Sequence, residues 1–207
     1  MSTKSNIIFA TQNKDKLQEI NKIFTSFNII SMSDAGYNID ITEDGQTYKE
    51  NASKKAQAIM DLSGMPVLAD DSGIEIDFFG GRPGIHASTF LTTNQHCKQR
   101  NKKILQLMED TSNRAAKYVC TIALFLPSSE RRDTQKYFTT GELVGSIATK
   151  AVGTNGFAYD EIFYVEQYNA TLAQITLEQK NKISHRNIAL RKMQDLMQEL
   201  IFRRLRA

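Results

Sequence analysis

A short apolar segment near the start of the chain passes through a polar loop into an amphipathic helix, and this order strongly restricts the fold. Residues 6–10 read NIIFA, which is typical of a buried strand. Apolar residues then recur at Leu17, Ile20, Ile23 and Phe24, at the spacings of three and four that mark one face of a helix. The first unit of the chain is therefore predicted to be strand, polar loop and helix.

The rest of the chain continues the alternation of helix and strand patterns. Thr47, followed three residues later by Glu50, is a capping-box signal for a helix that ends near Gly64, with Pro66 beyond it. The strand predicted at 67–69 runs straight into a polar segment. Helices interleaved with strands, with one hairpin-like pair of long strands, predict a mixed α/β fold. The further predicted elements are a tight turn at 80–84, a helix at about 94–108, strands at 118–126 and 136–147 joined by a polar turn at 128–133, a loop at 153–159 and a final helix after Ser184.

Length and composition are those of a globular chain that folds without cross-links. With 207 residues, the chain is long enough for one domain or two closely joined lobes. A chain of this size buries roughly 70% of the surface that its unfolded form exposes, so it needs no disulfide or structural metal. Cys97 and Cys120 are far apart and have no metal-ligand spacing, which predicts a reduced, cytoplasmic setting and argues against zinc.

Membrane and nucleic-acid partners find little support in the sequence. We expect no signal peptide, and nothing approaches the ~18 consecutive apolar residues of a membrane span. The net charge of +3 is too small to indicate nucleic-acid binding by itself. Much of that excess can lie in Arg203, Arg204 and Arg206, which we interpret as a solvated helix end whose cations favour the helix dipole.

The polar loop after the first strand is the first candidate binding site. A strand that leads into a loop at a helix start presents free N–H groups and the positive end of the helix dipole, which suits phosphate. The loop lacks the glycines of a P-loop or dinucleotide fingerprint, so taken alone it favours an ordinary strand-to-helix turn. It consists of Thr11, Gln12, Asn13, Lys14, Asp15 and Lys16.

Adjacent carboxylates at Asp70 and Asp71 form the second candidate site, after the apolar strand. Neighbouring carboxylates are costly to bring together without a compensating cation or base. Because side chains alternate along a strand, we expect them to point to opposite sides, so that one faces a site while the other braces the loop. Mg²⁺ prefers one or two carboxylates with water and phosphate, and Glu43 is a candidate second carboxylate. The alternative is an Asx turn that closes the strand at Ser72 and Gly73.

Two later segments have the chemistry of a nucleobase pocket. Residues 153–163 read GTNGFAYDEIF, and an aromatic ring beside glycines can stack on a base for about 1–3 kcal/mol. Asp160 in that segment can accept from a ring N–H or order the loop. Residues 180–186 read KNKISHR, where Arg186 opposes the dipole of the helix that it begins unless a ligand offsets its charge. The alternatives are a core aromatic, a structural histidine and an arginine that lies in water.

Five segments together resemble the motifs of the inosine triphosphate pyrophosphatase family, also called the non-standard purine NTP pyrophosphatases. In chain order they are FATQNKDKLQEI, EDGQTYKENASKKA, LADDSGIEIDFFGGRPGI, GFAYDEIF and KNKISHR. The resemblance as a whole covers nearly the entire chain, from about Ile7 to Leu200. The resemblance implies a single α/β domain over residues 1–207, with an elongated mixed sheet flanked by helices and two lobes around a central substrate cleft. It also implies a homodimer and a Mg²⁺-dependent hydrolysis of ITP, dITP and XTP to the monophosphate and pyrophosphate.

The resemblance also implies roles for individual residues. Glu43 and Asp71 would bind Mg²⁺, and Asp71 matches the catalytic base proposed for the family. Lys55 would reach phosphate together with the polar loop, and Ser72 would contact the substrate. The base would be enclosed by Phe157, Ala158, Tyr159, Asp160, Lys180, His185 and Arg186.

Some positions depart from the family pattern. Gln12 stands where the family usually has glycine, Ala158 replaces a frequent glycine, and Glu161 replaces a frequent proline. His86 and Thr89 occupy positions where the family tends to carry tyrosine and arginine. The absent arginine bears on substrate range or rate, although none of these changes removes an implied ligand.

Other functions stay open on the sequence alone. A related pyrophosphatase for modified or pyrimidine nucleotides would differ in its substrate panel. A catalytically silent nucleotide-binding regulator would bind ITP without turnover. A nucleic-acid binder that uses Arg203, Arg204 and Arg206 would show a steep salt dependence of its affinity.

Overall fold

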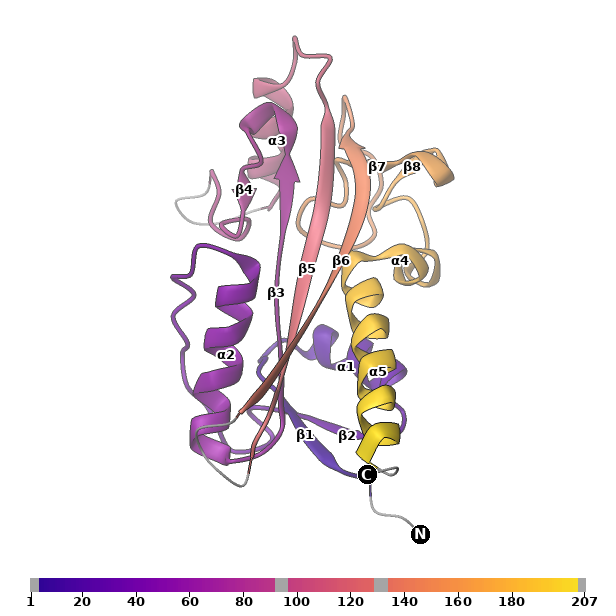
Figure 1. The fold of residues 1–207 in the computed structure, drawn as a ribbon. Helices are drawn as coiled ribbons and strands as arrows, with labels where there is room; N and C mark the ends of the chain where they lie inside the picture. The colour runs from indigo at the N-terminus through magenta and orange to yellow at the C-terminus, as the bar shows by residue number, and fades with distance from the viewer. Residues whose placement is uncertain (1–3, 92–96, 129–133, 205–207) are drawn as a thin grey trace. The chain divides into compact units, whose positions relative to one another are not determined.

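The computed structural model describes residues 4–91, 97–128 and 134–204, and it is a mixed α/β structure (Figure 1). Its sheet of eight strands has the order β2-β1-β3-β5-β6-β7-β8, with β4 paired to β3. The helices are α1 (Lys14–Ile23), α2 (Tyr48–Ser63), α3 (Cys97–Leu107), α4 (Leu177–Ile183) and α5 (His185–Arg204). The strands are β1 (Asn6–Phe9), β2 (Asn28–Ser31), β3 (Val67–Ile76), β4 (Pro83–Gly84), β5 (Ala115–Leu126), β6 (Gln135–Ile147), β7 (Phe163–Val165) and β8 (Ala170–Thr171). The predicted fold class is confirmed.

Both parallel and antiparallel pairs occur in the sheet. β1 is parallel to β2 and to β3, with Ile8 opposite Ile30 on one side and Val67 on the other. β3 is antiparallel to β4, and β7 is antiparallel to both β6 and β8. The mixture follows from the connections, because helices join the parallel strands at the start of the chain, whereas segments of a few residues join β3 to β4 and β7 to β8.

The chain divides into two compact units. Unit 1 contains Met1–Asp71, Cys120–Gly141 and Arg186–Ala207, and unit 2 contains Ser72–Val119 and Glu142–His185. The boundaries fall within β3, β5 and β6 and at the start of α5. Each of these strands therefore supplies residues to both units.

In unit 1, alternate residues of each strand serve two different cores. Ile7 and Leu68 belong to a cluster with Ile20 of α1 and Leu190 of α5. Their sequence neighbours, such as Ile8, belong to a second cluster, with Ala56 and Ile59 of α2. Figure 1 shows the same arrangement, with α2 on one side of β1 and α5 on the other. The period of two in the strands thus sorts the side chains between helices on opposite faces.

In unit 2, α3 encloses one core together with the last residues of β3 and β6 and the first residues of β5. Ile104 and Met108 pack with Ile74, Tyr118 and Phe163, and all five side chains are at most 8% exposed. The tilted ring pair of Tyr118 and Phe163, with centroids 4.7 Å apart, joins β5 to β7. The core of this unit is therefore built from residues that are far apart in the sequence.

The carboxylate strand is longer than predicted. The expected strand at 67–69 extends to Ile76, so Asp70 and Asp71 lie inside β3 and not at its end. The Asx turn considered at Ser72 is wrong for the same reason. The strand continues because Ile74 is fully buried and pairs with Gly84 of β4, which keeps the backbone in the sheet beyond the two carboxylates.

Most of the predicted helix and strand signals are confirmed. The Thr47 side chain accepts a 3.1 Å bond from the Glu50 amide, and Gly64 ends α2 with φ +64°. The Glu50 carboxylate, however, accepts from the Gln46 amide rather than from that of Thr47, so the reciprocal bond lies one residue earlier. The predicted helix at 94–108 is α3, and the strands at 118–126 and 136–147 are β5 and β6. The first part of that helix and most of the turn at 128–133 lie outside the described residues.

Several short elements were not predicted. α4 has a full capping box, in which Thr176 and Gln179 exchange side-chain to backbone bonds of 3.2 and 2.9 Å. The strands β2, β7 and β8 have between two and four residues, too few to show a period. Across the described part of the chain, no helix is long and apolar enough to cross a membrane.

Gly145 in β6 tests the packing of β6 against β7. A Cβ at this position would lie 2.7 Å from the Phe163 ring and even closer to the Tyr164 carbonyl. We expect Gly145→Ala to lower the free energy of unfolding by about 2 kcal/mol, because the ring and the β7 backbone must shift. Urea unfolding measures the change. Val144→Ala is the matched control, since Val144 is 72% exposed, and an equal loss in both variants would contradict the packing described.

Candidate functional site

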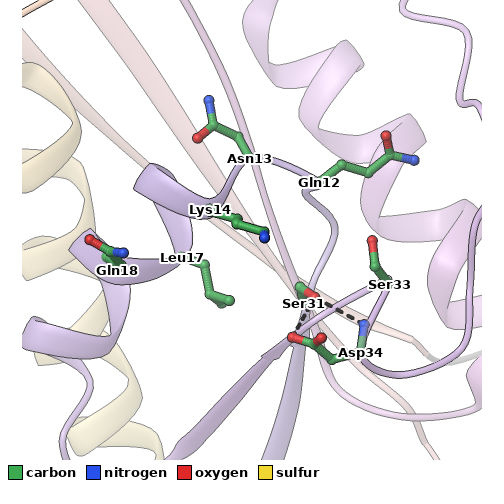
Figure 2. Close-up of a pocket in the computed structure, with 8 residues that line it drawn as sticks. All are labelled: Gln12, Asn13, Lys14, Leu17, Gln18, Ser31, Ser33 and Asp34. Atoms are coloured by element: carbon green, nitrogen blue, oxygen red, sulfur yellow. Dashed lines mark hydrogen bonds between the residues drawn. The ribbon is translucent and has the colours of Figure 1, made fainter.

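The polar segment at 11–16, in which residues 14–16 form the first turn of α1, borders a cavity of about 310 Å³ in unit 1. The cavity lies where the parallel strands β1 and β2 end, which is the usual position of ligand sites in parallel α/β sheets. Figure 2 shows the Lys14 side chain pointing toward the segment that follows β2. The lining residues are Gln12, Asn13, Lys14, Leu17, Gln18, Ser31, Ser33 and Asp34.

The loop uses its own side chains to hold its shape. The Thr11 hydroxyl accepts from the Asn13 amide at 3.1 Å, and the Asn13 side chain accepts from the Lys16 amide at 3.3 Å. One of the free amides at the start of α1 is therefore already satisfied. The Asp15 side chain lies outside the described residues. Lys16 turns to β3 and does not line the cavity.

Asp70 is a buried carboxylate held by cations from two helices. It is 1% exposed, and its oxygens lie 2.9 Å from Lys16 Nζ and 3.2 Å from Arg186 Nε. Arg186 Nη1 also lies 3.4 Å from a Glu19 carboxylate oxygen. Burial by itself would raise the pKa of Asp70, but the charges of Lys16, Arg186 and Lys55 hold that pKa well below its usual range. The carboxylate is therefore ionised throughout the neutral range.

Asp71 points to the opposite face of β3, toward α2. Its Oδ2 accepts a 3.0 Å bond from Asn51, and its Oδ1 lies 3.8 Å from Lys55 Nζ. The same ammonium lies 2.7 Å from Glu43 Oε2. Glu43 and Asp71 thus flank one cation, and the predicted divergence of Asp70 and Asp71 is confirmed by their different partners.

Asn51 is a site residue that the sequence reasoning missed. Its side chain is 1% exposed, accepts a 2.8 Å bond from the Gly45 amide and donates to Asp71. It therefore ties the turn that carries Glu43 to the carboxylate strand. The available signal was a polar residue on the buried stripe of α2, four residues before Lys55.

In unit 2, Phe157, Asp160 and Lys180 form a compact cluster. Asp160 is 3% exposed and accepts from the Phe157 amide at 2.8 Å and from Lys180 Nζ at 2.5 Å. Lys180 Nζ also lies 4.7 Å from the centroid of the Phe157 ring. That ring is 62% exposed, so it offers an aromatic surface with an ammonium beside it.

The remaining predicted residues have mixed positions. Tyr159 is 2% exposed and donates a 2.5 Å hydrogen bond to the Ala87 carbonyl, so it belongs to the core of unit 2. His185 stacks on the Tyr118 ring at 4.8 Å with an angle of 10° between the planes. Ser72 is half-buried in β3. These side chains support the walls of unit 2 more than they present functional groups.

The two carboxylates at Lys55 fit the donor set of a magnesium site. Among residues 4–91, 97–128 and 134–204, no group of three or more His, Cys, Asp and Glu side chains is suited to hold a metal. Mg²⁺ does not need such a group, because it is usually held by one or two carboxylates together with water and substrate phosphate. Glu43 and Asp71 supply hard oxygen atoms around a position that already attracts a cation.

Comparison with known proteins identifies the family of the chain. The Ham1 family matches residues 7–196. This chain belongs to the Ham1 family. It is 39% identical to a dITP/XTP pyrophosphatase of Geobacter sulfurreducens, over 91% of this chain and 94% of that protein. It is 37% identical to the protein of the same name from Listeria innocua, over 95% and 97% of the two chains. The resemblance read from the five motifs is therefore confirmed.

Solved structures of Ham1 proteins have the same fold. The Ham1 protein of Staphylococcus aureus superposes with a TM-score of 0.86 at 33% identity, over 94% of this chain and 99% of that one. A HAM1 protein from Coxiella burnetii gives the same TM-score at 35% identity, over the same shares of the two chains.

The buried carboxylate predicts a specific pH dependence of stability. We expect Asp70→Asn to lower the free energy of unfolding at pH 7 by about 3 kcal/mol, because Lys16 and Arg186 lose their buried counter-charge. Since folding lowers the pKa of Asp70, its contribution is complete above the ordinary value of about 4 and is lost as the pH falls toward the folded value.

Urea unfolding of wild type and variant at a series of pH values measures this effect. The difference between them should narrow as the pH falls from about 5 to about 3. Asp61→Asn, at an exposed position of α2, is the control and should show no such narrowing. A difference that stays constant over this range would contradict the role given to the Asp70 charge.

Proposed function

We propose that this chain is a Mg²⁺-dependent pyrophosphatase that hydrolyses noncanonical purine nucleoside triphosphates, namely ITP, dITP and XTP, to the monophosphate and pyrophosphate. The observation that carries the proposal is the arrangement on the α2 face of β3, where Glu43 and Asp71 flank Lys55 within 2.7 and 3.8 Å. Membership of the Ham1 family, with relatives named dITP/XTP pyrophosphatase, supports this class of hydrolase.

The charges on the two faces of β3 favour the α2 face for the metal. Lys16 and Arg186 balance Asp70 and Glu19 on the other face, two cations against two carboxylates. On the α2 face, Glu43 and Asp71 both approach the ammonium of Lys55. Their carboxylates are hard oxygen donors, and a divalent cation bound there would offset their negative charge. Mg²⁺, when bound, would supply positive charge that screens the phosphate oxygens from the attacking water.

The lysines on both sides of β3 are suited to the triphosphate. Each is held near a carboxylate, so its ammonium is positioned before the substrate arrives. Phosphate oxygens would take over part of these ion pairs, and Lys16 and Lys55 would then stabilise the charge that builds on the leaving pyrophosphate. Gln12, Asn13 and Lys14 would add donors from the cavity at the end of β1. Thr11, Asp15 and Ser72 complete the set of residues proposed at the phosphates.

Asp71 is proposed as the residue that activates water. Its Oδ2 is fixed by Asn51, and its Oδ1 faces Lys55 at 3.8 Å. A carboxylate oriented in this way would accept a proton from the water that attacks the α-phosphorus. Asp70 is not proposed for this role, because it pairs with Lys16 and Arg186 and faces the other helices.

The base is proposed to stack on the exposed ring of Phe157. Lys180 Nζ lies over that ring, 4.7 Å from its centroid, and would donate to the 6-oxo group of hypoxanthine or xanthine. Adenine carries an amino group at this position, which would leave the donor unpaired, and sites built on hydrogen bonds discriminate strongly in such cases. The other residues proposed around the base are Ala158, Tyr159, Asp160, His185 and Arg186.

The proposal includes a reduced, cytoplasmic setting and a homodimer. Cys97 and Cys120 are both free, and burial raises the pKa of Cys120 to about 12, so its thiol stays protonated. An unreactive thiol in the core and an unpaired cysteine at the surface suit a compartment that keeps thiols reduced. The homodimer rests on the family resemblance.

Pyrophosphate release across a nucleotide panel tests the function. With Mg²⁺, we expect turnover of ITP, dITP and XTP, and turnover of ATP and CTP that is lower by at least about 100-fold. In EDTA, we expect no turnover of any of these nucleotides. Asp71→Asn should lower kcat for ITP by about 100-fold or more, because the water loses its proton acceptor.

Asp61→Asn is the control for the loss of a carboxylate, since Asp61 is exposed on the same helix as Lys55. Thermal unfolding of each variant checks that the fold is retained. Preferred turnover of pyrimidine nucleotides, ITP binding without turnover, or an Asp71→Asn protein as active as wild type would each contradict the proposal.

A further inference from the structure

Arg100 of α3 is a buried arginine with unusual surroundings. It is 4% exposed, and its Nη1 donates a 3.3 Å hydrogen bond to the Ala87 carbonyl. Its guanidinium carbon lies 3.7 Å from the centroid of the Tyr159 ring. Within the part of the chain that the structure describes, Nε and Nη2 have no hydrogen-bond partner and no carboxylate forms an ion pair with it.

This arrangement does not serve stability. A buried guanidinium with two unsatisfied nitrogens costs free energy, since each lost hydrogen bond to water is uncompensated. An unbranched apolar side chain such as methionine would fill the same space without that cost, and replacing buried charges by apolar groups is often neutral or stabilising. The reason for an arginine is therefore to be sought in what its contacts hold.

Those contacts lie in the segment proposed to bind the base. Tyr159 lies between Ala158 and Asp160, and its hydroxyl donates to the same Ala87 carbonyl that Arg100 contacts. Asn101, the next residue of α3, donates to the Ala158 carbonyl at 2.8 Å and to Glu161 at 2.9 Å. Two consecutive residues of α3 thus contact this segment: Asn101 binds its backbone, and Arg100 packs on its buried ring.

The segment of residues 156–160 has a strained backbone conformation. Ala158 has φ +57°, in the left-handed region that side chains with a Cβ rarely adopt, and the nearby Gly156 has φ +76°. Such a backbone persists only where the surrounding structure enforces it. The contacts from Arg100 and Asn101 supply that enforcement on one side, and the bonds of Asp160 supply it on the other.

We propose that Arg100 is a positioning residue for nucleotide binding, because its planar cation holds Tyr159 and thereby sets the position of Phe157 and Asp160. This inference rests on the proposed function, in which Phe157 stacks on the base. Arg100 itself contacts no substrate in this proposal. Looser positioning of the segment would weaken binding of the base and leave the phosphates and the attacking water unaffected.

Arg100→Met is the main test, with Lys103→Met as the matched control. Lys103 lies on the same helix, is exposed and carries the same charge. We expect Arg100→Met to raise KM for ITP about tenfold, since it loses a buried cation–π contact. The kcat should stay within about twofold of wild type and the melting temperature should not fall. Arg100→Lys keeps the charge without the planar stack, and its KM should lie between the two.

Hydrogen exchange gives a readout that does not depend on turnover. In Arg100→Met, amides of residues 156–160 should exchange faster than in wild type, while those of β1 in unit 1 should be unchanged. Lys103→Met should match wild type in both measurements.

The possible outcomes separate the two proposals. If wild type turns over ITP and Arg100→Met keeps its KM, the positioning role is overturned. A lower melting temperature with unchanged exchange at 156–160 also overturns it, since Arg100 would then be a packing residue only. If Arg100→Met does not fold, Arg100→Lys decides by the same KM and exchange criteria. A wild-type protein without turnover of any nucleotide in the panel would overturn the proposed function, and exchange would still decide whether Arg100 holds the segment.

Discussion

The ion pairs of Asp70, a buried carboxylate in the middle of β3, constrain much of unit 1. A charge with 1% exposure is tolerated only with compensating charges nearby, and Lys16 from α1 and Arg186 from α5 provide them at 2.9 and 3.2 Å. These pairs fix both helices to the same strand. They also hold Lys16, which is proposed to contact the phosphates, at a defined position.

The alternation of side chains along β3 then separates two tasks between neighbouring residues. Asp70 faces α1 and α5, where it pairs with Lys16 and Arg186, whereas Asp71 faces α2 beside Glu43 and Lys55. One strand therefore carries a buried ion-pair network and a proposed catalytic group on adjacent residues.

In unit 2, the main structural requirement is to hold an exposed aromatic ring at a fixed position. Phe157 is 62% exposed, so its position depends on the residues on both sides of it. Asp160 binds the Phe157 amide, and Arg100 packs on Tyr159 at the cost of unsatisfied nitrogens. Local strain and unfavourable burial are thus concentrated around the segment that is proposed to receive the base.

By itself, the sequence determined the features that depend on backbone geometry and on near neighbours. The opening strand and helix and the opposite directions of Asp70 and Asp71 follow from periods of 3.6 and 2 residues, and the cap at Thr47 follows from the residue types that satisfy free helix amides. The order of the five motifs was sufficient to indicate the family. Only the tertiary structure decided which charges meet, because Asp70 and Arg186 are 116 positions apart and no local pattern encodes their register. The same holds for the length of β3, set by its pairing with β4, and for Asn51 and Arg100, whose importance lies entirely in partners from distant segments.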